Sequence, residues 1–69
     1  MDRTPVSSSN IRSIGYDSGS GTLEIEFNSG PVYQYFDVPE SEYDGLMAAS
    51  SHGTYFNASI KHAYQFVKL

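Results

Sequence analysis

The chain has 69 residues, six tyrosines, four phenylalanines and no cysteine. A domain of this size buries only about 60% of its unfolded surface, and without cysteine neither a disulfide nor a thiolate metal site can add stability. The formal net charge is −4, with only four Lys and Arg side chains, which argues against strong non-specific binding of nucleic acid, where phosphate contacts dominate the affinity.

The beginning of the chain is polar, and no apolar run approaches the length of a membrane span. We therefore expect no secretory signal and no transmembrane helix, and the predicted location is the cytoplasm. Residues 1–10 end in a run of Ser and Asn and are predicted to form a flexible lead-in. Residues 11–69 are predicted to form a single domain, since no linker or repeat interrupts them.

Three strands are predicted from alternating apolar and polar residues. The second is the clearest, because its apolar residues alternate with Glu24 and Glu26, which are expected to face solvent. In the first strand, Ile14 and Tyr16 share one face. The predicted strands span residues 11–17, 22–27 and 32–38.

The turn between the second and third strands decides which face two tyrosines occupy, because a slip of one residue reverses every side chain. A two-residue loop would require positive φ at Ser29, where Asn or Gly is preferred. A three-residue loop requires positive φ only at Gly30, and we favour it. This loop pairs the tyrosines with apolar residues, Tyr33 with Ile25 and Tyr35 with Leu23, which places both rings in the core.

A first helix is predicted over residues 40–50. Pro39 suits its first position, and carboxylates in its first turn complement the helix dipole. Gly45 weakens the middle of this helix, and a close approach of the backbone of another segment is one reason for a glycine here. Gly53 is the predicted C-terminal cap. The apolar stripe that faces the sheet consists of Tyr43, Leu46 and Met47.

A second helix is predicted over residues 55–63, with Thr54 as its N-cap and Phe56 and Ile60 facing inward. The tail that follows is too apolar and too rich in β-forming residues for a free terminus, and an added edge strand is one form it can take. The predicted fold is α+β: a three-stranded antiparallel β-meander, two short helices and a docked extended C-terminal segment.

Several motifs occur in a fixed order along the chain. They are the alternating segment 22–27, Gly30, Tyr33-Gln34-Tyr35, Val38-Pro39, Gly53-Thr54-Tyr55-Phe56-Asn57 and Ile60. From about Ser7 to the C-terminus, the chain resembles the KTSC domain, which is named for its occurrence at the C-terminus of some lysyl-tRNA synthetases and is also found as a stand-alone small protein. The resemblance implies a domain of unestablished function for which RNA binding is suggested.

No catalytic residue, metal ligand or cofactor site is predicted. His52 and His62 have a spacing that fits no zinc motif, and Glu24 and Glu26 are interpreted as a solvated strand face. The sequence leaves open a Ser-His-Asp triad of distant residues, but no Gly-x-Ser-x-Gly elbow is present. We therefore do not expect an enzyme.

Two classes of function remain open. The resemblance implies a module that binds RNA, with tRNA as the first candidate. The acidic charge, the thin core and the apolar C-terminal segment suit a module that binds another protein or a second copy of itself. No membrane partner is expected.

The residues predicted to contact RNA are aromatic, amide and basic. Exposed Tyr33 and Tyr35 would form a stacking platform for unpaired bases, although the strand register favours the core. Tyr55, on the outer side of its helix, is the better-placed aromatic contact. The full predicted set is Arg12, Tyr33, Tyr35, Tyr55, Asn57, Lys61, His62 and Lys68.

Overall fold

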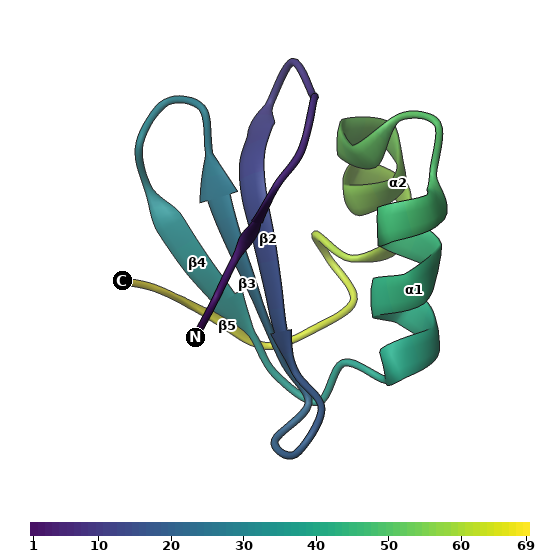
Figure 1. The fold of residues 1–69 in the computed structure, drawn as a ribbon. Coiled ribbons are helices and arrows are strands. Elements are labelled where there is room, and N and C mark those ends of the chain that lie inside the picture. Colours follow the sequence, from purple (N-terminus) through teal and green to yellow (C-terminus); the bar gives the residue numbers. More distant parts are fainter.

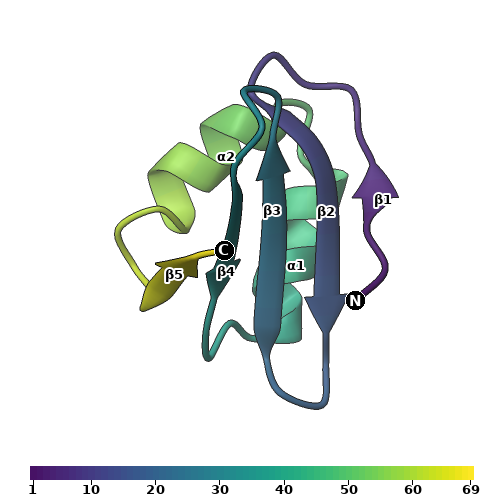
Figure 2. The same ribbon diagram turned by 90° about the vertical axis from the view of Figure 1, so that its left-hand side faces the viewer.

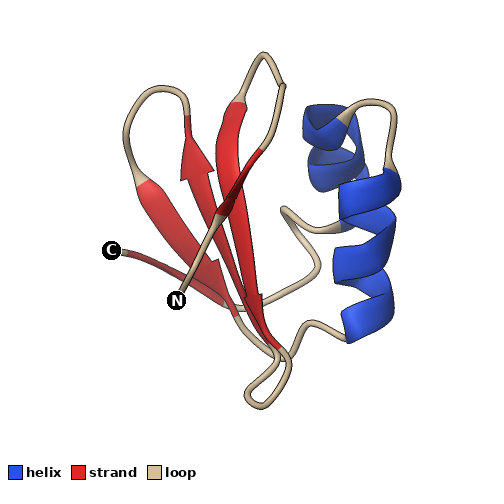
Figure 3. Cartoon of the chain, in the orientation of Figure 1, coloured by secondary structure: helices blue, strands red, loops and turns tan.

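A computed structural model describes residues 1–69 as one antiparallel sheet with two helices on one of its faces (Figure 1). The strands are β1 (Thr4–Pro5), β2 (Ile11–Asp17), β3 (Thr22–Phe27), β4 (Val32–Tyr35) and β5 (Phe66–Lys68), and the helices are α1 (Glu40–Ala48) and α2 (His52–Ser59). The order of the strands in the sheet is β1-β2-β3-β4-β5. Figure 3 separates the layer of strands from the layer of helices, and Figure 2 looks onto the face of the sheet that carries no helix.

The predicted α+β class and the order of elements are confirmed, but the number of strands is wrong: five strands form instead of three. The predicted lead-in supplies β1, which pairs with β2, and the docked tail forms β5, which pairs with β4. Figure 2 shows these two strands at opposite edges of the sheet. The third predicted strand is shorter than expected and ends at Tyr35, because Asp37 adopts a φ of 57° and turns the chain toward α1.

The three-residue loop between β3 and β4 is confirmed. Gly30 has a φ of 115°, and the Phe27 N–H donates to the Pro31 carbonyl oxygen at 3.0 Å. The pairs that follow are those predicted from the sequence, Leu23 with Tyr35 and Ile25 with Tyr33. Tyr35 is only 4% exposed, and Tyr33 is half-buried.

The core lies between the sheet and the helices. Ile11 and Ile14 are both fully buried although their spacing breaks the alternation of a regular strand. A bulge between Ile11 and Ser13 inserts one extra residue, which returns Ile14 to the inner face. The buried apolar residues are Ile11, Ile14, Leu23, Ile25, Tyr35, Val38, Leu46, Phe56 and Ile60.

The predicted apolar stripe on α1 is confirmed: Leu46 is buried, and Tyr43 and Met47 are packed against the core. Both predicted ends of the second helix are wrong, because α2 spans His52–Ser59 and not residues 55–63. Ser51 is the N-cap of α2, and its Oγ accepts a hydrogen bond from the Thr54 N–H at 3.2 Å. Gly53 is therefore buried inside α2 and does not cap α1, which ends at Ala48.

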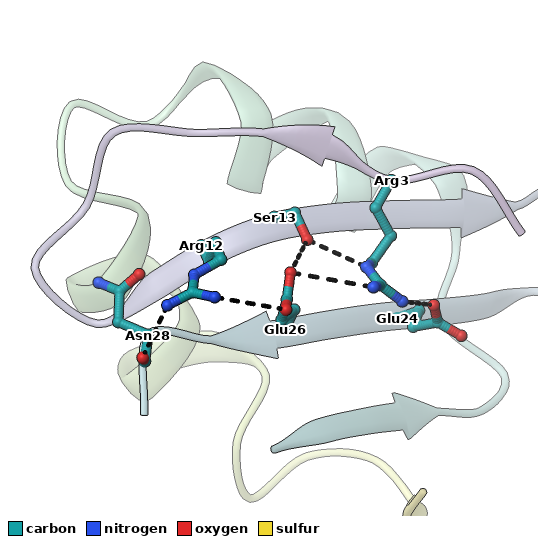
Figure 4. Close-up of polar contacts among 6 residues, drawn as sticks. All are labelled: Arg3, Arg12, Ser13, Glu24, Glu26 and Asn28. Atoms are coloured by element: carbon teal, nitrogen blue, oxygen red, sulfur yellow. Dashed lines mark hydrogen bonds and ion pairs between the residues drawn. The ribbon is translucent and has the colours of Figure 1, made fainter. Parts of the chain in front are cut away.

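The face of the sheet without helices carries a polar network (Figure 4). The prediction that Glu24 faces solvent is wrong, because this residue is only 5% exposed. Its carboxylate pairs with Arg3 and accepts a hydrogen bond from Gln34 Nε2 at 2.8 Å. The N-terminal residues lie against this face so closely that a Cβ on Gly15 would come within 2.6 Å of the Asp2 carbonyl oxygen.

Glu24 should make the stability of the domain depend on pH. Its burial alone would raise the pKa of the carboxyl, but hydrogen bonds from Gln34 and Arg3 and the charge of Arg3 outweigh burial and lower the pKa below 4.5. The ionised carboxylate therefore adds stability that is present above about pH 4.5 and is lost as the pH falls through the lower, folded value.

We expect Glu24→Gln to reduce the free energy of unfolding at neutral pH and to flatten its decrease in acid. Urea denaturation at a series of pH values below neutrality measures both effects. Asp44→Asn, at an exposed position of α1 outside its first turn, is the matched control and should keep the acid decrease of the unchanged protein. An equal acid decrease in Glu24→Gln and in the unchanged protein would contradict the role assigned to Glu24.

Candidate functional site

A groove with a volume of about 860 Å³ opens on the helix-covered side of the sheet. It lies between the turn that joins β3 to β4, the strands β4 and β5, the loop before β2, and α2 with the turn that follows. We call it the groove. Its lining residues are Ser9, Asn10, Phe27, Asn28, Ser29, Pro31, Tyr33, Tyr35, Gly53, Phe56, Asn57, Lys61, His62 and Phe66.

Aromatic rings from three neighbouring strands and α2 form the apolar part of the groove. Phe27 and Tyr33 are half-buried and Phe66 is 53% exposed, so these three rings are accessible. Tyr35 and Phe56 are buried, with ring centroids 5.4 Å apart. Burial raises the pKa of the Tyr35 hydroxyl to about 12. The accessible rings offer stacking surfaces, and the buried pair supports them.

The polar part of the groove carries positive charge and no negative charge. Lys61 and His62 line it, whereas none of the eight Asp and Glu side chains does. Lys61 forms no ion pair, because the three ion pairs of the domain all use arginines. A second, smaller hollow on the molecule contains both Asp2 and Glu26. In a domain of net charge −4, the groove is thus suited to an anionic ligand.

The structure brings together five of the eight residues that the sequence predicts to contact RNA. The groove contains Tyr33, Tyr35, Asn57, Lys61 and His62. Tyr35 is available as support for the accessible rings but not as a stacking platform, because it is buried.

Arg12, Tyr55 and Lys68 do not line the groove. Arg12 lies with the polar network of Figure 4, where its guanidinium is 3.9 Å from Glu26 and donates to the Asn28 carbonyl oxygen at 3.1 Å. Lys68 is exposed on the edge strand β5.

Tyr55 was expected on the outer side of its helix, but it lies half-buried against α1. Its hydroxyl donates to Glu42 Oε1 at 2.6 Å, and the Tyr64 hydroxyl donates to Glu42 Oε2 at 2.9 Å. The hydrogen bond to Glu42 raises the pKa of Tyr55. A Cβ on Gly45 would lie 2.9 Å from Tyr55 Cζ, so the close neighbour of this glycine is a side chain and not the backbone that was predicted.

Nine of the 14 residues that line the groove are not among the predicted site residues. Four of the nine offer an accessible ring or an exposed amide: Asn10, Phe27, Asn28 and Phe66. The alternation of β3 assigns Phe27 to the inner face, and the apolar tail contains Phe66, so a signal for both rings was present in the sequence. Asn10 and Asn28 come from two loops 18 positions apart. The Asn28 N–H donates to the Asn10 carbonyl oxygen at 2.8 Å, and Asn28 Nδ2 donates to the Ser8 carbonyl oxygen at 2.9 Å. No local pattern in the sequence indicates these contacts.

No helix of the structure combines the length and the apolar character needed to cross a membrane. The structure also brings together no group of three or more His, Asp or Glu side chains that could hold a metal ion. The fold and the groove together define a small α+β domain with an open, carboxylate-free cleft beside a five-stranded sheet.

The chain belongs to the KTSC domain family, whose sequence model matches residues 7–64. A crystal structure of a KTSC domain protein from Yersinia pestis superposes with a TM-score of 0.94, has 45% sequence identity, and covers 99% of this chain and 96% of that one. An uncharacterised protein from Stutzerimonas stutzeri is 43% identical over 88% of this chain and 86% of its own length. A lysine–tRNA ligase from Nostoc punctiforme is 44% identical over 86% of this chain, which spans only 10% of the ligase.

Proposed function

We propose that this domain is a non-catalytic binding module and that unpaired RNA binds in its groove. The observation that carries this proposal is the distribution of charge: an acidic domain keeps every carboxylate out of one aromatic groove and leaves Lys61 unpaired there. An anion with flat, apolar faces fits such a surface, and a nucleotide has both properties.

The relatives support the choice of RNA. Besides the Nostoc punctiforme protein, a lysine–tRNA ligase from Trichormus variabilis is 41% identical to this chain over 86% of its length. These enzymes are named for a tRNA substrate, and about a tenth of each is similar to this domain. We infer that the domain contributes RNA contacts both as part of a lysine–tRNA ligase and in a short chain such as this one, with tRNA as the first candidate.

The ligand should be unpaired, because the accessible rings lie inside a groove. Bases in a duplex are stacked on one another, whereas bases of a loop or a free end can turn outward onto an aromatic side chain. Stacking contributes about 1–3 kcal/mol per base. Electrostatic attraction adds little, since few cationic side chains can reach phosphate groups, and we expect salt to weaken binding only gently.

Lys61→Gln tests the electrostatic part of the proposal. We expect this variant to bind a fluorescently labelled, single-stranded RNA several-fold more weakly at low salt. The slope of log affinity against log salt should become less negative by about 0.7, the value for one neutralised phosphate of a single strand. A titration at several salt concentrations measures both quantities.

Lys68→Gln is the matched control, because Lys68 is also unpaired but lies outside the groove. It should keep the affinity and the slope of the unchanged protein. If single-stranded RNA moves no amide resonance of the domain even at low salt, the proposed function is wrong.

The edge strand β5 supports a second candidate function, the binding of another protein or of a second copy. Phe66, Val67 and Leu69 are 53%, 44% and 65% exposed, and β5 has no neighbour on its outer side. An exposed edge with apolar side chains can pair with a strand from another chain. Sedimentation of the domain over a range of concentrations tests self-association directly.

A further inference from the structure

We infer that the groove is a site for a single nucleotide: one unpaired base lies against Tyr33 and Phe66, and one adjacent phosphate lies at Lys61 and His62. This inference rests on the proposed function and states the unit of RNA that the groove recognises. The orientation of the rings and the placement of Lys61 and His62 point to this unit, and the groove is large enough to hold it.

The accessible rings do not form a continuous stacking platform. Phe27 and Tyr33 meet edge to face, with an angle of 84° between their planes, and Tyr33 and Phe66 are tilted by 48°. Successive bases of a strand stack in parallel, so these rings cannot support two or three neighbouring bases at once. They offer a flat contact to one base.

The same rings cannot hold a base between them. The ring centroids of Tyr33 and Phe66 are 5.8 Å apart. A base inserted between two rings needs about twice the stacking distance of roughly 3.4 Å, and therefore more room than these rings leave. The base should lie flat on one of these two rings, on the side that faces the groove, and meet the other ring at an angle.

The groove is large enough to hold a ligand of this size. Its volume of about 860 Å³ falls within the range of about 300–1,000 Å³ that is typical of small-molecule sites. The turn between β3 and β4 and the turn after α2 both contribute residues to its lining.

The charges of the groove suit one phosphate. Lys61 and His62 are consecutive residues in the turn after α2, and both are exposed. The other unpaired lysine, Lys68, does not line the groove. Lys61 supplies the positive charge, and the His62 ring adds a hydrogen-bonding group beside it. Because both residues come from one short turn, they offer a contact to one anionic group rather than to a line of phosphates.

Two amides can contact the edge of the base. The side chains of Asn10 and Asn57 line the groove, are exposed, and make no hydrogen bond within the chain. Each amide offers both a donor and an acceptor, which match the adjacent acceptor and donor on the edge of a base. The groove thus contains a partner for each part of a nucleotide: the face of the base, its edge and its phosphate.

The test is a length series observed through amide chemical shifts. Nucleoside monophosphates, dinucleotides and single-stranded hexanucleotides are titrated separately into the labelled domain. We expect a monophosphate to shift the resonances of Tyr33, Asn57, Lys61 and Phe66, and a hexanucleotide to shift the same set with less than about tenfold higher affinity. The salt slope of the hexanucleotide should lie near −0.7, as for one phosphate.

Phe66→Ser tests the stacking contact, with Val67→Ser as the matched control. Both side chains are exposed on β5, but only Phe66 lines the groove. We expect Phe66→Ser to weaken binding of the monophosphate roughly 5- to 140-fold, which corresponds to 1–3 kcal/mol for a stacked base. Val67→Ser should change the affinity less than twofold, and the spectra of both variants report whether the fold is kept.

The outcomes separate the inference from the proposed function. If hexanucleotides bind and monophosphates do not, or if the salt slope is steeper than about −2, the one-nucleotide site is wrong and RNA binding stands. If monophosphates bind in the groove and no RNA oligomer does, the site is real but serves free nucleotides, and the proposed function fails. If neither binds, both are overturned.

Discussion

Tyr35→Ala should unfold most of the domain at room temperature. The Tyr35 side chain is 4% exposed and packs between Phe56 and Phe66, with ring centroids 5.4 Å and 5.6 Å away. Removing a large aromatic side chain from a core costs about 3–5 kcal/mol, which approaches the whole stability expected of a domain of this size. Urea denaturation followed by circular dichroism measures the loss.

Tyr35→Phe is the control, because it keeps the ring and removes only the hydroxyl. It should remain folded, with an unfolding midpoint close to that of the unchanged protein. If Tyr35→Ala were equally stable, the ring would have to lie outside the core, and the register of β3 and β4 would be wrong.

That register could be predicted because one glycine determines it. Only Gly30 can take the positive φ of a three-residue loop, and once this loop is assigned, the alternation of β3 fixes which tyrosine meets which aliphatic residue. The register thus depends on the backbone conformation of a short loop, which can be inferred from the residues of that loop alone.

The burial of Glu24 could not be predicted in the same way. Alternation correctly assigns this residue to the face opposite the core, but it does not say whether another segment covers that face. The cover comes from Arg3, 21 positions earlier, together with the first residues of the chain. Nothing in the local pattern around Glu24 indicates such a distant partner.

The start of α2 illustrates a competition between two equivalent signals. Ser51 and Thr54 are both good N-cap residues, and the structure uses Ser51, whose hydroxyl accepts from the Thr54 N–H. The earlier start places Gly53 inside the helix, next to Asn10, where a Cβ would approach the Asn10 side-chain nitrogen to 3.2 Å. Capping preferences alone do not decide between Ser51 and Thr54. The start at Ser51 is the one that packs Gly53 against the loop before β2.

In the candidate site, too, some features could be predicted from local sequence and others depend on distant contacts. The aromatic and basic residues near Lys61 could be selected from the sequence with the help of the family resemblance. Their separation from every carboxylate could not, because the groove is made by four segments that meet only in the fold. Arg12 was selected for its charge, and the structure pairs that charge with Glu26.

Gly45→Ala should have opposite effects on stability in two backgrounds. Alanine normally stabilises the middle of a helix by about 1 kcal/mol relative to glycine. Here the new Cβ would lie 2.9 Å from Tyr55 Cζ and even closer to the Tyr55 hydroxyl, so the ring must move and lose its hydrogen bond to Glu42. We therefore expect Gly45→Ala to reduce the free energy of unfolding by about 1–3 kcal/mol, as overpacking typically does.

Tyr55→Leu should reverse that effect, because leucine keeps an apolar contact and vacates the space beside Gly45. In the Tyr55→Leu background we expect Gly45→Ala to raise the free energy of unfolding by about 1 kcal/mol, the ordinary preference of a helix for alanine. Urea denaturation of the two single variants and the double variant gives the interaction energy of the pair. Equal effects of Gly45→Ala in both backgrounds would mean that Tyr55 does not occupy this space, and that another contact requires the glycine.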